Sequence, residues 1–342
     1  MTSAGIRAAL DAGVGGVVAK SINESPAAAR QLDQARYVQL DETLHQVPWG
    51  GGDPGDSLFC RSGLAGHDPT AWFHELALLD RAARRNGQFV AGSIVLGSPD
   101  GAIDMAAIAE RAGLRVLELN VGAPHGKEAA AGAITNATAA DPISKIVQEV
   151  RKVYFGQLWV KLSGVSSDPT ALAIAARRGG ADAVGLIGRS LGMVPDLETM
   201  RPIIDTSAAY GGRWALPITC RWLALTRRAS GGRLPMLGTN GARDGHDAAR
   251  MMLAGACAVQ MTSAVFQAGF AALSAANSLL EEWLDGKRLH AGAIVGRAAD
   301  ALQTYAEQPE IAGHWREIVP PGALERPPLD MARQSVPDSR LD

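Results

Sequence analysis

The stretch 158-LWVKLSG-164 is a short apolar run that ends in serine and glycine and carries one charge, Lys161. An ammonium group in a strand that is otherwise fit for burial is costly unless an acceptor meets it. Six further runs share this plan, and small or polar residues crowd their C-terminal ends: 15-GGVVAKSI-22, 89-FVAGSIVL-96, 116-VLELNVG-122, 183-AVGLIG-188, 235-PMLGTNG-241 and 258-AVQMTS-263. Parallel α/β barrels present their active face at such strand ends.

Segments with helical spacing lie between the runs. We predict helices over 72–87, 101–113, 168–180 and 244–256, with Gly87 as a C-cap and Asp168 and Asp244 as N-caps. This alternation predicts an α/β fold with a parallel sheet, a (β/α)8 TIM barrel. Seven strands are predicted, and the first helix, 3–13, begins almost at Met1. The first strand of a closed barrel is thus missing or is supplied by another segment or chain.

Two regions fall outside the alternation. Residues 44–68 are rich in glycine and proline, which favours an excursion over the barrel mouth. Residues 309–342 carry many prolines and little periodicity, which is typical of an extended, Pro-rich tail. We expect one barrel domain over 1–308, followed by this tail. The Ala/Ser-rich stretch 261–280 is predicted to be one amphipathic helix packed on the barrel, not a membrane span.

The composition narrows the functional classes. The 342 residues carry a net charge of −2 with a pI near 6.4, so no overall field favours nucleic acid or an anionic membrane, and a small-molecule substrate fits better. Three cysteines form no CxxC motif and cannot supply the four ligands of an iron–sulfur cluster, and no metal site is predicted. Without a disulfide pattern or a signal peptide, we expect a cytoplasmic protein.

The turns after the last two runs give the strongest local signal. Gly238 and Gly241 allow a close backbone approach, and Thr239, Thr262 and Ser263 offer hydroxyl donors. In a (β/α)8 barrel, the loops after the last two strands and a nearby helix N-terminus form a phosphate site. A phosphorylated ligand at the barrel mouth is therefore favoured over tight turns that bind nothing.

Several segments, in the same order, resemble the flavin domain shared by dihydroorotate dehydrogenases and dihydropyrimidine dehydrogenases. They are 2-TSAGIRAALDAGVGGVVAKSI-22, 117-LELNVGAPHG-126, 160-VKLSG-164, 180-GADAVGLIG-188, 211-GG-212 and 236-MLGTNGARDGHDAARMMLAGACAVQMTSA-264. The Pro-His-Gly at 124–126 is more similar to the dihydropyrimidine branch. The resemblance implies a TIM barrel with FMN across its strand ends, and commonly a homodimer.

The resemblance also implies which residues hold the cofactor. Lys161 matches the family lysine beside the flavin N1/O2 edge, where a cation stabilises the anionic reduced flavin. Its structural alternative is a lysine paired with a core carboxylate such as Glu118. Lys20 matches a second lysine near the flavin, or else is a lysine that snorkels from a strand end. The other implied cofactor residues are Ser21, Asn120, Gly211, Gly212, Gly238, Thr239, Asn240, Gly241, Thr262 and Ser263.

Three positions depart from the family pattern. The family's catalytic Cys or Ser is Ala123 here, which cannot titrate, and two family asparagines that bind substrate are replaced by Gly188 and Cys60. Each lost contact costs about 1–3 kcal/mol, so ordinary oxidation of dihydroorotate or reduction of uracil is not expected. His125, in the same loop as Ala123, is suited to proton transfer at neutral pH, with substrate binding as its alternative role.

Cationic side chains near these positions favour an anionic substrate. Arg189 directly follows Gly188 and is able to pair with a carboxylate, and Arg61 and Arg213 are further candidates. Each arginine taken alone is more often a solvated surface charge. The expected substrate-binding residues are Cys60, Asn120, His125 and Arg189, and the expected catalytic residues are His125 and Lys161.

Three functional hypotheses follow from these observations. The first is an FMN-dependent oxidoreductase that acts on the CH–CH bond of a small, anionic ring or unsaturated substrate. In the second, the loss of the usual base marks a flavoprotein with changed chemistry, either oxygen-using or non-redox. In the third, the chain is a flavin-binding subunit or pseudoenzyme that needs a partner, such as an electron-transfer subunit.

Overall fold

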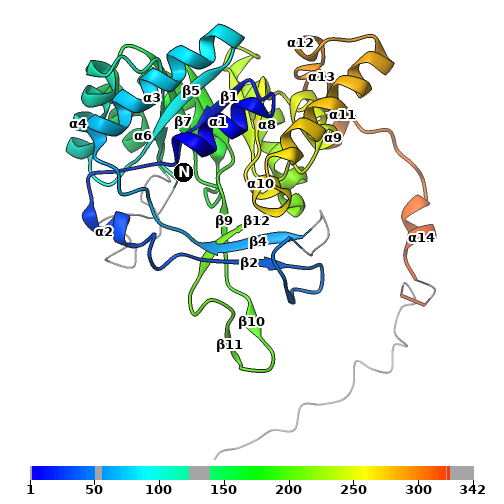
Figure 1. Cartoon of the computed structure of the whole chain (residues 1–342). Coiled ribbons are helices and arrows are strands. Elements are labelled where there is room, and N and C mark those ends of the chain that lie inside the picture. Colours follow the sequence, from blue (N-terminus) through cyan, green and yellow to red (C-terminus); the bar gives the residue numbers. More distant parts are fainter. Residues whose placement is uncertain (1, 51–55, 123–138, 321, 324–342) are drawn as a thin grey trace, which may run out of the picture. The chain divides into compact units, whose positions relative to one another are not determined.

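A parallel sheet surrounded by helices forms the centre of the computed structural model, which describes residues 2–50, 56–122, 139–320 and 322–323 (Figure 1). Its strand order is β1-β5-β6-β7-β8-β13-β14. The strands are β1 (Gly16–Val18), β5 (Phe89–Val95), β6 (Val116–Asn120), β7 (Gln157–Lys161), β8 (Ala183–Leu186), β13 (Met236–Thr239) and β14 (Ala258–Gln260). They coincide with the seven predicted runs, and the predicted TIM-barrel type of α/β fold is confirmed.

The sheet has two free edges within the described residues. There, β1 pairs only with β5, and β14 pairs only with β13, so no eighth strand joins them. Helix α11 (Ala271–Lys287) is bonded to the turn that follows α1 (Ser3–Asp11). Ser274 Oγ donates to the carbonyl of Ala12 at 2.9 Å, and Asn277 Nδ2 donates to that of Gly13 at 2.9 Å. These bonds tie the last long helix of the barrel to its first.

The predicted barrel helices begin and end within three residues of the expected positions. Asp168 accepts from the Ala171 amide at 3.0 Å, and Asp244 accepts from the Asp247 amide at 2.9 Å, as N-caps should. Gly87 adopts the left-handed conformation, with φ 73°, directly after helix α3 and its final 3-10 turn. The helices around the sheet are α3 (Pro69–Ala83), η1 (Arg84–Asn86), α4 (Pro99–Arg111), α6 (Ala140–Arg151), α7 (Pro169–Gly179), α8 (Leu216–Ser230) and α9 (Gly245–Leu253).

The prediction of one continuous helix over 261–280 is wrong. The chain forms α10 (Ser263–Ala268) and then α11, and Gly269 between them has φ 69°. A residue with positive φ cannot continue a right-handed helix, so the chain turns there. Short helices α12 (Ala291–Ile294) and α13 (Arg297–Asp300) follow. No helix in the described part of the chain is both long and apolar enough to cross a membrane.

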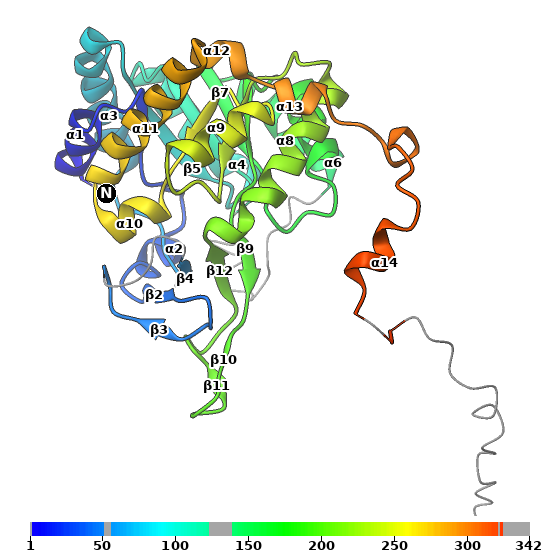
Figure 2. The ribbon, with the colours of Figure 1, turned by 90° about the vertical axis from the view of Figure 1, so that its right-hand side faces the viewer.

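A second, five-stranded sheet lies across the carboxyl ends of the barrel strands (Figures 1 and 2). Its order is β3-β2-β4-β12-β9. The strands are β2 (Arg36–Leu40), β3 (Gln46–Val47), β4 (Ser57–Arg61), β9 (Ser190–Gly192) and β12 (Ala208–Gly211), with α2 (Pro26–Arg30) before them and the hairpin β10 (Pro195–Asp196) and β11 (Arg201–Pro202) beyond. The predicted excursion, 44–68, covers only part of this sheet, because the segment after β8 contributes two of its strands.

The chain divides into two units, the main unit Met1–Leu302 and a second unit, Gln303–Asp342. Its described elements are η3 (Tyr305–Glu307) and α14 (His314–Ile318). A further 3-10 turn, η2 (Arg213–Ala215), lies in the main unit. Thr304 and Glu307 form a capping box at the start of η3. Most of the predicted Pro-rich tail, from residue 324, lies outside the described residues.

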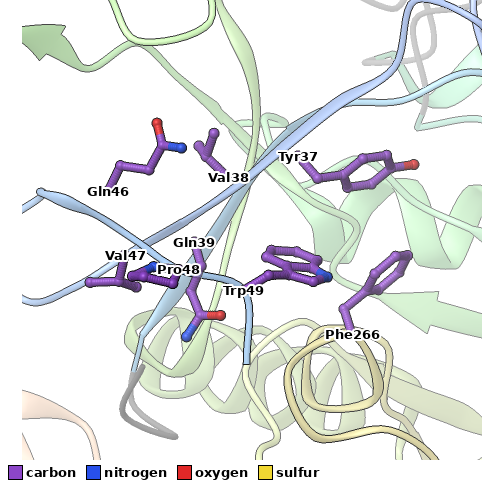
Figure 3. Close-up of a pocket in the computed structure, with 8 residues that line it drawn as sticks. All are labelled: Tyr37, Val38, Gln39, Gln46, Val47, Pro48, Trp49 and Phe266. Carbon is purple, nitrogen blue, oxygen red and sulfur yellow. The ribbon is translucent and has the colours of Figure 1, made fainter. Parts of the chain in front are cut away.

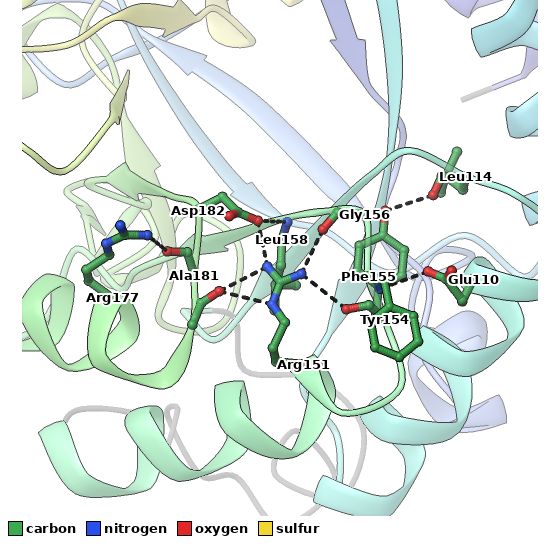
Figure 4. A network of polar contacts seen from close by, with 11 residues as sticks. Glu110, Leu114, Arg151, Tyr154, Phe155, Gly156, Leu158, Arg177, Ala181 and Asp182 are labelled. Atoms are coloured by element: carbon green, nitrogen blue, oxygen red, sulfur yellow. Dashed lines mark hydrogen bonds and ion pairs between the residues drawn. The ribbon is translucent and has the colours of Figure 1, made fainter.

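Arg151 locks the amino-terminal ends of β7 and β8 together (Figure 4). Its guanidinium donates to the carbonyl oxygens of Gly180 at 2.9 Å and Gly156 at 2.8 Å, and to Asp182 Oδ2 at 2.6 Å. The same Asp182 oxygen accepts from the Leu158 amide at 2.8 Å. One planar cation thus satisfies groups on two turns that regular sheet pairing leaves unbonded.

We expect Arg151→Met to lower the free energy of unfolding by about 2–4 kcal/mol, because it leaves several partly buried acceptors without a donor. Urea unfolding followed by circular dichroism measures this. Arg178→Met, at an exposed position on the neighbouring helix α7, is the control and should change stability by less than about 0.5 kcal/mol. Equal losses in the two variants would contradict the locking role.

Candidate active site

Predicted site residues lie at the carboxyl ends of the barrel strands. Asn120 ends β6 and is directly opposite Lys161, which ends β7. Lys20 follows β1, where the chain still pairs with β5 through the bridge of Ile22 to Ile94. Because the strands are parallel and in register, these ends form one face. The sheet geometry therefore brings the two predicted flavin lysines to the same end of the barrel.

The second sheet closes over this face. The amide of Ala65, just after β4, donates to the carbonyl of Ser21 at 3.0 Å. Arg189, just after β8, donates through Nη1 to Cys60 Sγ at 3.2 Å and to Ser62 Oγ at 3.2 Å. Cys60 is buried within β4, whereas Arg189 is exposed. Two of the predicted substrate-binding residues are thus in contact, although 129 positions separate them in the sequence.

Lys20, Lys161 and Arg189 form the strand-end cation cluster. Burial, together with the charges of Arg189 and Lys161, lowers the pKa of Lys20 from 10.5 to about 8, while Cys60 acts in the opposite direction. Within the described residues Lys20 has no hydrogen-bond or ion-pair partner, and the side-chain partners of the other two are uncharged: Gln260, Cys60 and Ser62. Positive charge gathered without an anionic partner is unfavourable, so the cluster is suited to an anionic ligand.

A chain of hydrogen bonds connects Lys161 to a buried carboxylate. Lys161 Nζ donates to Gln260 Oε1 at 3.2 Å, and Gln260 Nε2 donates to Glu118 Oε2 at 3.3 Å. Ser93 Oγ donates to the other Glu118 oxygen at 3.0 Å and lies 2.8 Å from Ser21 Oγ. The direct pair of Lys161 with Glu118, considered as the structural alternative, is therefore replaced by contact through Gln260, a residue that the sequence analysis did not single out.

The turn after β13 is rigidly held. Asn240 has φ 71°, its Nδ2 donates to the Gly188 carbonyl at 3.3 Å, and its own carbonyl accepts from Thr219 Oγ1 at 2.7 Å. A Cβ on Gly211, which ends β12, would lie 3.0 Å from Asn240 Oδ1. This turn therefore brings the predicted cofactor residues of β12 and β13 together with the end of β8.

Two of the predicted phosphate-site glycines also have structural reasons to be glycine. A Cβ on Gly238 would lie 2.8 Å from Met251 Sδ on helix α9. Gly241 has φ 127°, and a Cβ there would lie 2.6 Å from the backbone of Leu216 at the start of α8. Close helix packing alone therefore accounts for both residues, and their part in binding phosphate stays a prediction.

Hydroxyl groups remain available beside this turn. Thr262 is the N-cap residue of α10, yet its side chain makes no cap hydrogen bond, and Ser263 begins the helix. Thr239, at the end of β13, is buried, with 7% of its surface exposed. No side-chain hydrogen bond ties these three hydroxyls to the described part of the chain, so their donors are free for a ligand.

Other predicted residues are engaged elsewhere or lie outside the described residues. Arg61 donates to the Gln34 carbonyl at 3.1 and 2.8 Å, and Arg213 pairs with the buried Asp247 at 3.5 Å. Of the three candidate arginines, only Arg189 belongs to the strand-end cation cluster. The segment 123–138, which holds Ala123 and the predicted catalytic His125, lies outside the described residues.

An apolar groove of about 440 Å³ lies on the second sheet beside α10 (Figure 3). Phe266 stacks on Tyr37 with ring centroids 5.4 Å apart and meets Trp49 edge-on at 6.2 Å. None of the predicted site residues lines it. Tyr37 of β2 lies directly opposite Cys60 of β4, so it connects the groove to the site, and burial raises the pKa of its hydroxyl.

Comparison of the sequence with known proteins identifies the family of this chain. Residues 98–284 match the sequence model described as dihydroorotate dehydrogenase. The chain belongs to the dihydroorotate dehydrogenase family. Enzymes of this family bind FMN and are oxidoreductases that act on CH–CH donors.

The similar proteins are catalytic subunits named dihydroorotate dehydrogenase B (NAD(+)). The protein from Phocaeicola vulgatus is 37% identical over 151 residues, which is 44% of this chain and 48% of that protein. The protein from Methanocella arvoryzae is 29% identical over 301 residues, 87% of this chain and 90% of that one. The protein from Methanosarcina acetivorans is 29% identical over 261 residues, 76% of each. The match to the Phocaeicola relative spans about half of that protein's length.

The strand-end residues fit the cofactor of the dihydroorotate dehydrogenase family. FMN carries a dianionic phosphate, and its ring gains negative charge on reduction, so the reduced ring supplies an anion for Lys20 and Lys161. Lys20, Lys161 and Asn120 would face the ring, and the turns at Asn240 and Thr262 would face the phosphate. The assignment of each residue to FMN stays a prediction.

We expect the affinity of the apoprotein for reduced FMN, whose ring is anionic, to fall as the pH rises above 8. An anion binds the ammonium form of Lys20, and that form is lost from the free protein above its pKa of about 8. The limit is about tenfold per pH unit until the pKa of the complex is reached. Anaerobic titration of the protein fluorescence between pH 7 and 9.5 measures this.

In Lys20→Met the affinity should be low at pH 7 and flat with pH. Lys152→Met, at an exposed residue paired with Glu149 on the outer helices, is the matched control and should retain the wild-type profile. A wild-type profile in Lys20→Met would exclude Lys20 from the anion site.

Proposed function

We propose that this chain is an FMN-dependent oxidoreductase that acts on the CH–CH bond of a small anionic ring or unsaturated acid. The observation that carries the proposal is the strand-end cation cluster, in which Lys20 has no partner within the described residues and Lys161 and Arg189 have only uncharged side-chain partners. Membership of a family of FMN enzymes supports the cofactor, and the extra arginine supports the charge of the substrate.

FMN, when bound, supplies hydride transfer at a carbon of the substrate. The chain contributes charge and orientation. Lys161 would hold an ammonium beside the part of the ligand that gains negative charge, and Asn120 would offer its amide from the adjacent strand end. Its Oδ1 already accepts from the Gly122 amide at 3.0 Å, which leaves the Nδ2 hydrogens to donate.

The substrate side of the site differs from one that binds a neutral ring amide. Cys60 and Gly188 stand where the resemblance implies asparagines, so two amide groups are gone. In their place Arg189 lies against Cys60 and Ser62 with the rest of its guanidinium free of described protein acceptors. A guanidinium binds a carboxylate through two parallel hydrogen bonds, which favours an acid as substrate.

Proton transfer would fall to a group other than the usual base. Ala123 has no titratable atom, and His125 is the nearest residue in the sequence that titrates near neutral pH. We propose His125, or a water molecule, as the proton carrier. This assignment rests on the sequence alone.

A second candidate function is that of a flavin-binding subunit that acts only with a partner. The relatives are named catalytic subunits of an NAD(+)-dependent enzyme, which supports an accompanying electron-transfer subunit. The two free sheet edges within the described residues are compatible with a contact of this kind. Recovery of bound flavin only on co-expression with a second subunit would favour this candidate, and a yellow, active protein purified alone would favour the first.

The proposed cofactor predicts that Lys161→Met keeps the fold but slows flavin reduction at least tenfold, because the developing negative charge loses its cation. Stopped-flow absorbance with dithionite as the reductant measures the rate, and circular dichroism checks the fold. A wild-type protein that does not bind FMN, or a variant with unchanged reduction, would contradict the assignment.

The proposed substrate class predicts that the site prefers a ring with a carboxylate. Orotate and uracil differ by that group, and their binding perturbs the absorbance of bound flavin. We expect orotate to bind the wild type at least tenfold more tightly than uracil, and Arg189→Gln to remove this preference without changing the affinity for FMN. Arg61→Gln is the matched control, since Arg61 is bonded to Gln34. Equal binding of both rings by the wild type would refute an anionic substrate.

A further inference from the structure

The polarity of the hydrogen-bond chain below the cation cluster is fixed by its one acidic member. A carboxylate only accepts, so Glu118 takes a hydrogen from Ser93 Oγ at 3.0 Å and another from Gln260 Nε2 at 3.3 Å. With its hydrogen committed to Glu118, Ser93 accepts from Ser21 at 2.8 Å. Gln260 then presents its oxygen, its only acceptor, to Lys161 at 3.2 Å. In both parts of this hydrogen-bonded series, Ser21 to Ser93 and Lys161 to Gln260, the hydrogens are thus donated in the direction of Glu118.

The side-chain amide of Gln260 also determines how much of the positive charge on Lys161 is cancelled by Glu118. In direct contact, Glu118 would form an ion pair with the ammonium and neutralise most of its field. Gln260 lies between them, so Lys161 keeps a strong acceptor while the carboxylate stays one side chain away. Glu118 is 3% exposed, and its two oxygens are bonded to Ser93 and Gln260, which satisfies the buried group without the lysine. The ammonium is therefore held in place and yet remains a net cation.

We propose that Gln260 and Glu118 are positioning residues that fix the Lys161 ammonium at the strand ends with its charge uncancelled. Four strands contribute to the arrangement, because Gln260 ends β14, Lys161 ends β7, Glu118 lies in β6 and Ser93 in β5. The inference deepens the proposed function and rests on it, since it requires the lysine to face FMN.

The midpoint potential of bound FMN tests the proposal. Gln260→Met preserves the length of the side chain and removes both polar contacts, so the ammonium is no longer fixed. We expect the preference for reduced over oxidised FMN to fall about tenfold, which corresponds to about 30 mV for a two-electron couple. Gln260→Glu places a carboxylate against the lysine and should lower the preference by at least as much. Dye-coupled anaerobic titration measures both variants.

A double-mutant cycle shows whether Gln260 acts through the lysine. In the Lys161→Met background, Gln260→Met should have no further effect on the potential, because the group that it positions is absent. Gln88→Met is the matched control: this glutamine is likewise bonded, through Nε2 to the carbonyls of Leu10 and Val14, but at the other end of the barrel. It should alter the melting temperature and leave the potential unchanged.

The possible outcomes distinguish a failure of the positioning role from a failure of the proposed function. A potential that moves in Lys161→Met but stays at the wild-type value in both Gln260 variants overturns the positioning role and leaves the proposed function intact. Additive shifts in the double variant overturn it as well, because Gln260 would then act independently of the lysine. A wild-type protein that fails to bind FMN overturns both proposals. If Gln260→Met does not fold, the Gln260→Glu variant, which keeps the size and polarity of the side chain, decides the question.

Discussion

Positive charge held at the strand ends without an opposing carboxylate among the described residues is the constraint on which the candidate site depends. Burial and the repulsion from Arg189 and Lys161 lower the pKa of Lys20 to about 8, which shows that the folded chain holds its ammonium at a cost. An anionic ligand removes both contributions at once, because it replaces lost solvation and offsets the repulsion. The site is thus less favourable alone than with an anion, and this unfavourable free energy is recovered as affinity when an anion binds.

The amino-terminal and carboxyl ends of the barrel strands differ in how their charged side chains are paired. At the amino-terminal end two arginines are paired with acids: Arg151 meets Asp182 at 2.6 Å and Arg115 meets the buried Asp80 at 2.7 Å. Those pairs also bond backbone groups, so they stabilise the turns between helix and strand. At the carboxyl end, the buried acid Glu118 is kept from Lys161 by the Gln260 amide. Stabilising ion pairs therefore lie at one end of the barrel, and cations unpaired within the described part of the chain lie at the other, which is the end where barrel enzymes have their active sites.

The parallel sheet was predictable because its signals are local. Each strand is a short apolar run with a polar end, and the caps Asp168 and Asp244 mark helix starts within three residues of the groups they bind. The second sheet was not predictable, since β4 pairs with β12 about 150 positions later and no local pattern encodes that partner. The break between α10 and α11 at Gly269 was not predicted, for a related reason. Hydrophobic spacing continues across it, and only the sign of one backbone angle divides the two helices.

The candidate site, like the fold, depends partly on local sequence signals and partly on contacts between distant positions. The burial of a lysine in an apolar strand called for an acceptor, and the sequence offered the flavin or Glu118 as alternatives. The structure shows why the two do not exclude each other. Gln260, 99 positions away, satisfies one hydrogen of Lys161 and leaves two to donate toward a ligand. An amide can face an ammonium and a carboxylate at once, because it has one acceptor end and one donor end. A polar residue at the end of an apolar strand, like Lys161 itself, was the signal that could have identified Gln260 beforehand.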